Sequence, residues 1–143
     1  MPNGWGSGTH VKLEEVEGIG PLYARRLRKA GVRSLHTLLK KGAKPGDRKE
    51  IAKSASLSSK QVLEWVNRAD LFRVKGIGSE YSDLLEQAGV DTALELAKRK
   101  PTALYDTLAK VNESKKLVRR LPTEKQVSAW VKNARKLPRV IEY

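Results

Sequence analysis

The sequence predicts an all-α fold in which two pseudo-repeats pack into one compact unit. Apolar residues recur at helical spacing along most of the chain, and the sustained period-two alternation typical of strands is absent. Residues 16–38 resemble residues 74–96 at an offset of 58, and residues 60–69 resemble residues 125–134 at an offset of 65. Two matches in the same order indicate a duplication, whereas a single short match arises readily by chance.

The repeats predict a division of the chain after residue 72. Residues 1–11 are expected to form a flexible, Gly-rich N-terminal segment, and Trp5 within it is assigned no role. Residues 12–72 form the first predicted repeat and residues 73–143 the second. Each is expected to contain a glycine-rich turn, a middle segment with a short helix, and a Trp-bearing helix.

In the first repeat, a helix is expected to begin at about residue 21. Pro21 suits the first helical turn, where its missing N–H is not needed. Gly31 suits the left-handed position just past the helix end, and Val32 behind it can make the closing apolar contact. Ser34 is a suitable N-cap for the next helix.

The rest of the first repeat is expected to form a turn and two further helices. Residues 42–46 predict the turn, and a short helix carrying Ile51 follows. Ser58 and Gln61 have the spacing of a capping box that opens the Trp65 helix. Because Trp65 lies on the apolar face of that helix, core packing is favoured over stacking on bases.

The second repeat is expected to follow the same plan. Asp91 is expected to cap a helix, and Pro101 to open the middle helix. Thr123 and Gln126 form a second predicted capping box, and Trp130 lies on the apolar face of the helix that follows. Trp130 is therefore also expected in the core.

The charge balance favours a polyanionic partner. The chain has 29 Lys and Arg against 16 Asp and Glu, with a formal net charge of +13 and a pI near 10.1. A surplus of this size on a small protein favours DNA or RNA over a charge that serves solubility alone.

Several functional classes lack the residues that they require. The absence of cysteine excludes disulfides, thiolate zinc sites and cysteine nucleophiles. His10 and His36 cannot hold a metal alone, so neither metal nor cofactor is expected. No GxSxG, HExxH or lysine-bearing phosphate loop indicates an enzyme. No apolar run is long enough to span a membrane and no signal peptide is evident, so a cytoplasmic protein, free or nucleoid-associated, is expected.

Two Gly-Ile-Gly turns carry a resemblance to a known motif. In residues 16–32 and 74–90 an apolar residue precedes each turn, a helix follows it, and Gly-Val closes the unit. This pattern resembles the helix-hairpin-helix motif. The layout of residues 12–143, including both Trp helices and the closing Leu-Pro-Arg-Val-Ile-Glu-Tyr, also resembles a bacterial and archaeal family that shares a domain of unknown function. The family resemblance implies no activity.

We call residues 18–20 the first glycine turn and residues 76–78 the second glycine turn. Gly18 and Gly20 allow a sharp bend and a close approach by another surface, and Ile19 between them is expected to point inward. The helix that follows presents free N–H groups at the turn, where an anion can bind. The helix-hairpin-helix resemblance implies that one phosphate is held there without base reading.

The two repeats differ in charge beside these turns. Five basic residues follow the first turn: Arg25, Arg26, Arg28, Lys29 and Arg33. Five acidic residues occupy the matching window of the second repeat: Glu80, Asp83, Glu86, Asp91 and Glu95. Glu80 falls in the first helical turn, where it would repel a phosphate. The first turn is therefore predicted to bind nucleic acid, and the second to bind weakly or not at all.

The acidic window has two further interpretations, because it could face the basic window of the first repeat or dock a basic protein. For Tyr23 and Tyr81, on the helices after the turns, support of the core or of the turn is favoured over contact with a ligand. The candidate nucleic-acid-binding residues are Gly18, Ile19, Gly20, Tyr23, Arg25, Arg26, Arg28, Lys29, Gly76 and Gly78. A later basic group either extends the phosphate track or forms a solvated surface: Lys98, Arg99, Lys100, Lys115, Lys116, Arg119 and Arg120.

The function predicted from these features is non-sequence-specific binding of DNA, or alternatively of RNA, through backbone phosphates at the first glycine turn. The other hypothesis is a protein–protein adaptor that binds no nucleic acid. Partners that persist after nuclease treatment would favour the adaptor.

Overall fold

The computed structural model describes residues 11–143, and every regular element in that range is helical, so the predicted all-α class is confirmed. Trp5 and His10 lie outside the described residues. Val11, predicted to be flexible, instead packs against the core, and its carbonyl accepts the Leu35 N–H (3.2 Å). A 3-10 helix precedes the α-helices in this order: η1 (Leu13–Glu15), α1 (Pro21–Lys29), α2 (Leu35–Lys41), α3 (Pro45–Ala55), α4 (Ser59–Leu71), α5 (Ser79–Gln87), α6 (Ala93–Ala97), α7 (Pro101–Lys115) and α8 (Glu124–Lys136).

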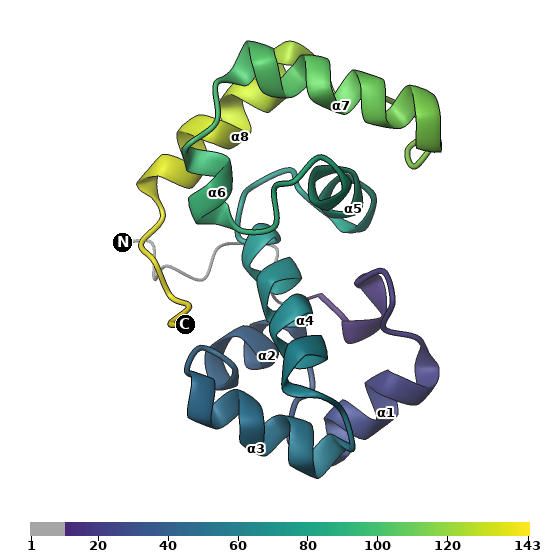
Figure 1. The fold of residues 1–143 in the computed structure, drawn as a ribbon, viewed down its shortest axis with the longest axis vertical. Coiled ribbons are helices and arrows are strands. Elements are labelled where there is room, and N and C mark those ends of the chain that lie inside the picture. The colour runs from purple at the N-terminus through teal and green to yellow at the C-terminus, as the bar shows by residue number, and fades with distance from the viewer. Residues whose placement is uncertain (1–10) are drawn as a thin grey trace.

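Two apolar cores lie along the long axis of the molecule (Figure 1). The first is enclosed by η1 and α1–α4 and contains Trp65, and the second is enclosed by α5–α8 and contains Trp130. Both Trp side chains are 3% exposed, which confirms their predicted place in the core. The end of α4 serves both cores, because Leu71 packs into the second and Phe72 into the first. The boundary predicted after residue 72 falls at this shared segment.

The end of α1 has the predicted glycine geometry. Gly31 has φ +86°, its N–H donates to the Arg28 carbonyl (3.0 Å), and the Val32 N–H donates to the Leu27 carbonyl (2.8 Å). This pair of bonds satisfies carbonyls that a helix end leaves without partners. The end of α5 is built in the same way around Gly89, which has φ +90°.

Two helix starts differ from the predictions. Thr92, rather than Asp91, caps α6, because the helix begins at Ala93 and the Thr92 hydroxyl directly before it accepts the Glu95 N–H (3.1 Å). The turn predicted for residues 42–46 is shorter than expected, since α3 begins at Pro45.

The two predicted capping boxes form to different extents. Thr123 and Gln126 form both bonds of the box at the start of α8, as predicted. At the start of α4 only half of it forms: the Ser58 hydroxyl accepts the Gln61 N–H (3.1 Å), while the Gln61 amide points to Glu64 (3.4 Å). A carboxylate one turn along the helix thus competes with the cap for this amide.

The C-terminal tail, residues 137–143, returns from α8 to the first half of the molecule. Ile141 is buried in the first core, and the Glu142 N–H donates to the Ala43 carbonyl (2.7 Å). Arg48, 5% exposed, donates to the Glu142 carbonyl (2.8 Å) and to the carbonyls of Gly42 and Ala43. The tail therefore ties the end of the chain to the α2–α3 connection.

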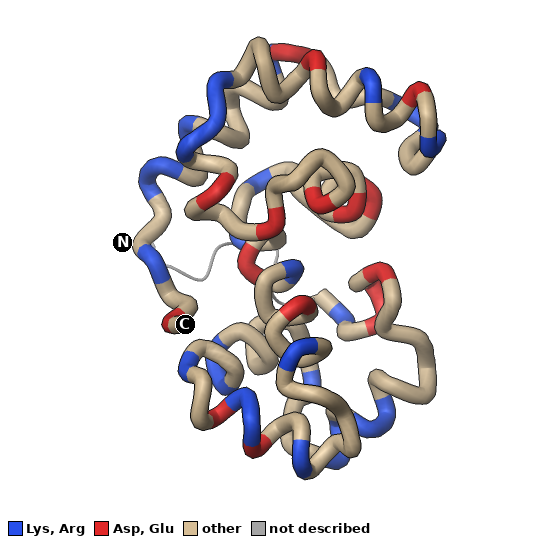
Figure 2. Tube along the Cα trace, in the orientation of Figure 1, with Lys and Arg blue, Asp and Glu red and all other residues tan. Residues whose placement is uncertain are grey.

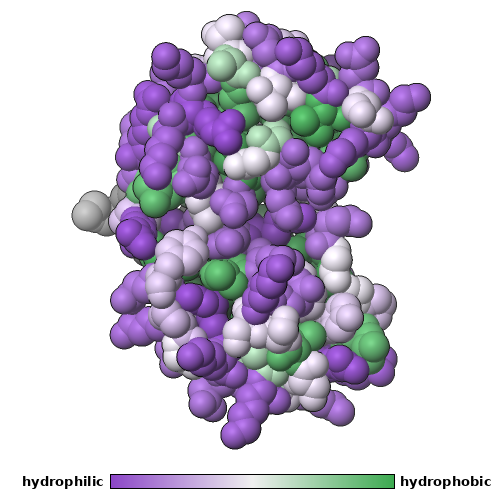
Figure 3. Space-filling model, in the orientation of Figure 1, coloured by the Kyte–Doolittle hydropathy of each residue, from purple (hydrophilic) through white to green (hydrophobic). Residues whose placement is uncertain are grey.

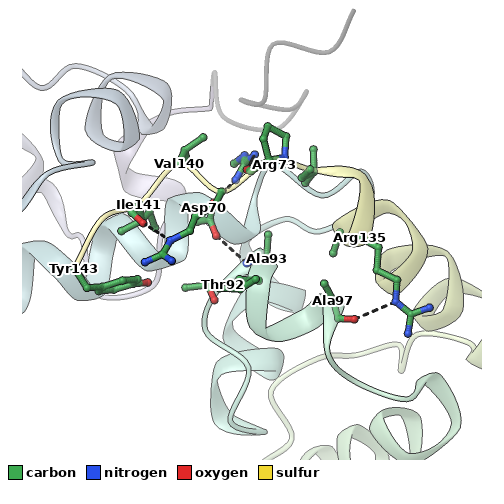
Figure 4. Close-up of a pocket in the computed structure, with 14 residues that line it drawn as sticks. Asp70, Arg73, Thr92, Ala93, Ala97, Arg135, Val140, Ile141 and Tyr143 are labelled. Atoms are coloured by element: carbon green, nitrogen blue, oxygen red, sulfur yellow. Dashed lines mark hydrogen bonds and ion pairs between the residues drawn. The ribbon is translucent and has the colours of Figure 1, made fainter.

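A buried ion pair anchors the tail where the two halves meet (Figure 4). Arg73 donates to Asp70 Oδ1 (2.6 Å) and to the Pro138 carbonyl (2.6 Å), while Asp70 Oδ2 accepts the Ala93 N–H at the start of α6 (2.8 Å). Both charged side chains are at most 5% exposed. The end of α4, the start of α6 and the tail are therefore joined through one carboxylate and one guanidinium.

Candidate nucleic-acid interface

The first glycine turn lies on the surface between η1 and α1. Gly18 has φ +96°, which L side chains rarely adopt. Ile19 is buried, as predicted, and its N–H donates to the Val16 carbonyl (3.0 Å), so it supports the turn rather than facing a ligand. Gly20 is exposed, and a Cβ added there would meet no described atom within 4 Å. A partner can therefore approach the backbone of Gly20 closely.

The start of α1 is open beside this turn. Gly20 is the N-cap, and no side chain of residues 11–143 caps the helix. The first α-helical bond runs from the Ala24 N–H to the Gly20 carbonyl (2.9 Å), and Pro21 has no N–H. The amides of Leu22 and Tyr23 therefore have no intrahelical acceptor and contribute to the partial positive charge at the helix start. A phosphate group is a suitable acceptor for such amides.

Trp65 supports the first glycine turn from the inside. Its Nε1 lies 3.7 Å from the position that a Cβ on Gly18 would occupy. The Tyr23 ring packs on Trp65 with a centroid separation of 5.4 Å and remains 38% exposed. Tyr23 therefore both supports the turn and borders the surface beside it.

A shallow hollow beside the turn is lined by Glu14, Pro21, Arg25, Arg28, Lys29 and Arg33. Arg25, Lys29 and Arg33 are exposed and form no ion pair with another described residue. Arg33 was predicted among the basic residues that follow the turn but was not one of the ten candidate binding residues. We call Gly18, Gly20, Arg25, Lys29 and Arg33 the first-turn surface.

Two other predicted basic residues are held by contacts within the chain. Arg28 donates to both carboxylate oxygens of Glu14 (2.7 and 2.9 Å), and this hydrogen-bonded pair lowers the pKa of Glu14. Arg26 lies over the Tyr23 ring, 5.7 Å from its centroid. Sequence reasoning did not find Glu14 as a partner, because the acid lies outside the repeated window. Arg25 and Lys29 are therefore the most available of the predicted cations.

The second glycine turn has a closely similar backbone. Gly76 has φ +92°, Ile77 is buried, and Gly78 is the exposed N-cap of α5. Trp130 lies beneath the turn, with its Nε1 3.1 Å from a Cβ position on Gly76, and the Tyr81 ring packs on Trp130 at 5.1 Å. Gly76 and Gly78 are thus presented much as Gly18 and Gly20 are.

The charged surroundings of the second turn are different. Glu80 occupies the first turn of α5, where it complements the helix dipole itself. Asp83 and Glu86 form ion pairs with Arg68 of α4, so part of the acidic window does face a base of the first repeat. That base lies on the Trp65 helix and is not one of the arginines beside the first glycine turn.

A family model described as domain of unknown function (DUF4332) matches residues 17–137 of the chain. The chain belongs to the DUF4332 family. The matched segment contains both glycine turns and both Trp helices. The DUF4332 chain matches no curated protein and no solved structure.

The first part of the later basic group of this DUF4332 chain, residues 98–100, lies away from the first-turn surface. Lys98, Arg99 and Lys100 form the connection between α6 and α7, and α6 packs along α8. The tube view shows this basic connection and the end of α8 in the upper half of the molecule, with α1 in the lower half (Figure 2). It therefore does not extend the track that begins at the first glycine turn.

The described part of the DUF4332 chain contains no group of three or more His, Asp or Glu side chains placed to hold a metal ion. Among the same residues, no helix has the length and apolar character needed to cross a membrane.

Proposed function

We propose that this chain binds nucleic acid without sequence specificity, by holding a backbone phosphate at the first glycine turn. The observation that carries the proposal is an uncapped helix start, reached over bare glycine backbone, with the exposed cations Arg25 and Lys29 lining a hollow that runs along α1 from Pro21. Contacts to phosphates position a protein on nucleic acid and carry no base information. DNA duplex is the first substrate to test, with RNA duplex beside it.

The proposal joins this geometry to the helix-hairpin-helix resemblance. In that motif a glycine-rich bend leads into a helix whose free amides hold one phosphate. Here Gly18 and Gly20 flank a buried Ile19, α1 starts directly afterwards, and Trp65 supports the bend. The first-turn surface thus has a backbone donor set and cations on the same side of the turn.

The sharpest test follows the turn amides directly. In a ¹⁵N-labelled sample titrated with a short DNA duplex, the Gly18, Gly20, Leu22 and Tyr23 amide resonances are expected to shift most. If the duplex binds and these resonances stay in place, the turn is not the site.

Charge reversal gives a second test of the same site. Arg25→Glu with Lys29→Glu is expected to abolish the amide shifts while leaving the far-UV circular dichroism unchanged. Removal of two phosphate contacts should reduce the slope of log affinity against log salt by about 1.8. Lys44→Glu with Lys49→Glu changes the charge equally on exposed positions at the start of α3 and is expected to leave the amide shifts intact.

The adaptor hypothesis has less support from the second glycine turn. A basic partner would need the acidic side chains beside this turn to be free, and Asp83 and Glu86 are already paired with Arg68. Glu80 remains exposed at that turn. A partner recovered from lysate after nuclease treatment, and lost on Glu80→Lys, would support the adaptor.

A further inference from the structure

The positive charge of the chain is concentrated in two segments separated by an acidic one. Residues 12–53 contain 12 Lys and Arg against 5 Asp and Glu, and residues 98–139 contain 13 against 3. Residues 54–97, between them, contain 4 against 7. The larger surplus therefore lies in the last third of the chain and not beside the first glycine turn.

In the folded chain the two basic segments lie apart. α1 and α3 lie toward one end of the long axis, and α7 and α8 lie toward the other (Figures 1 and 2). α5, which bears Glu80, Asp83 and Glu86, lies between them. The two basic regions are thus separate surfaces with an acidic region between them.

The second basic surface is formed where α6 and its following connection pack along α8. We call Lys98, Lys100, Lys132, Arg135 and Lys136 the α8-end surface. On α8, positions 132, 135 and 136 lie three and four residues apart and so share one face. The Arg135 Nε donates to the Ala97 carbonyl (3.1 Å), which brings this face next to Lys98. The space-filling view is mainly hydrophilic in this upper part of the molecule, with some hydrophobic patches (Figure 3), and Leu94 on α6 is 44% exposed.

Interactions within the chain account for only part of the charge on the α8-end surface. Arg135 and Lys136 complement the carbonyl end of α8, and Lys98 forms an exposed pair with Glu95 (3.6 Å). Lys100 and Lys132 are exposed and have neither role. Of the 13 basic residues in residues 98–139, only Lys98 forms an ion pair within the described part of the chain. Lys100 and Lys132 are therefore available to an external anion.

We propose that the α8-end surface binds the phosphate backbone of a second nucleic-acid segment, so that one molecule bridges two duplexes. A duplex is stiff over about 150 base pairs, so a single short one cannot bend around this small molecule to reach both ends. Glu80 of α5, which is exposed and forms no ion pair with another described residue, would also repel a strand laid between the two surfaces. The inference rests on the proposed function for one of its two contacts.

The experiment measures recruitment of one duplex by another. A short biotinylated DNA duplex is fixed to beads, protein is bound, and the beads are washed. A fluorescent duplex of the same length is then added, and its recruitment is compared for four proteins. These are the wild type, Lys132→Glu with Lys136→Glu (the end variant), Arg25→Glu with Lys29→Glu (the turn variant), and Lys44→Glu with Lys49→Glu as the charge-matched control.

We expect the wild type and the control to recruit the fluorescent duplex. The end variant is expected to remain on the beads and to recruit about tenfold less, since charge reversal at two contacts is a large loss for phosphate binding. The turn variant is expected to lose recruitment similarly. A protein that carries all four substitutions should not bind the beads.

The outcomes separate this inference from the proposed function. If the end variant recruits as much duplex as the wild type, bridging through the α8-end surface is wrong and the first-turn proposal stands. If the turn variant recruits normally while the end variant leaves the beads, the first-turn proposal is wrong and the α8-end surface is the phosphate site. Sedimentation of the protein alone adds a check, because an end variant that changes from dimer to monomer would make this face a contact between copies and overturn the inference.

Discussion

The two glycine turns have closely similar backbones and buried supports, and they differ in the charged side chains around them. Gly18 and Gly76 have φ values of +96° and +92°, each turn has a Trp beneath it, and each following helix starts without a side-chain cap. Yet basic side chains follow the first turn, whereas Glu80 occupies the start of the helix after the second.

The positions that hold the turn in shape are therefore distinct from the positions that meet a partner. A left-handed glycine, a buried isoleucine and a supporting Trp are constrained by packing, so a change at any of them disturbs the fold. The exposed positions of α1 and α5 carry no such constraint, and their charge can change without altering the backbone. Similar turns can thus serve different partners.

The largest expected effect in the comparison of the two turns comes from the Trp side chains that lie beneath them. Trp65→Ala and Trp130→Ala are each expected to lower the free energy of unfolding by about 3–5 kcal/mol, because both remove a large buried ring. Urea unfolding followed by circular dichroism measures both. If the two losses in unfolding free energy differ by more than about 2 kcal/mol, the width of this range, the two turns are supported in different ways.

The glycines provide the next largest effect. Gly18→Ala and Gly76→Ala are expected to cost about 1–2 kcal/mol, because an L side chain is strained at positive φ. Gly76→Ala should cost more, since its Cβ would lie 3.1 Å from Trp130 against 3.7 Å from Trp65 at Gly18. Gly20→Ala is the comparison, expected to cost only about 0.5–1 kcal/mol, because its Cβ would meet open space and the loss is that of a better N-cap residue. Equal stabilities for all three variants would contradict the role given to the positive φ.

A charge change at the second glycine turn tests whether the backbone of that turn can bind phosphate. Glu80→Lys removes an acid from the first turn of α5 and is expected to lower stability by about 0.3–1 kcal/mol. With a DNA duplex present, the Gly76 and Gly78 amide resonances are expected to shift in this variant and not in the wild type. Unchanged resonances would mean that the second turn lacks more than a favourable charge.

The smallest effect concerns Glu14, which has no equivalent at the second turn. Glu14→Gln frees Arg28 and is expected to strengthen duplex binding by about twofold to fivefold, the range of an exposed charge contact. Fluorescence anisotropy with a labelled duplex measures this, and weaker binding would show that the pair positions Arg28 productively.

The Glu14–Arg28 pair also predicts a dependence on pH. The guanidinium of Arg28 lowers the pKa of Glu14, so the contribution of the pair to stability is present at neutral pH and is lost as the pH falls through the lowered pKa. The melting temperatures of the wild type and Glu14→Gln should therefore converge in acid. A difference that persists there would assign it to packing.

Features with a local cause could be predicted from the sequence, and features set by tertiary contacts could not. Gly31 and Ser34 act as predicted because a helix end and a cap depend on a few neighbouring residues. The cap at Thr92 in place of Asp91 is also local in origin, because Thr92 occupies the position that matches Ser34 at the repeat offset of 58.

In the candidate site, the exposed glycines and the basic side chains of α1 could be predicted from the repeat. The Arg28 contact with Glu14 could not, because it joins residues that the repeat does not relate. The separation of the charge into two basic ends likewise depends on how the helices pack.

The returning tail also affects the order in which the protein can fold during synthesis. Ile141 belongs to the first core, and Arg48 donates to the carbonyl of Glu142. The helices of the first half therefore leave the ribosome with an incomplete core, and Arg48 lacks one of its acceptors until residue 142 has been made. Domains usually fold one after another as they emerge. The core enclosed by α1–α4 is thus completed only after Ile141 has been made.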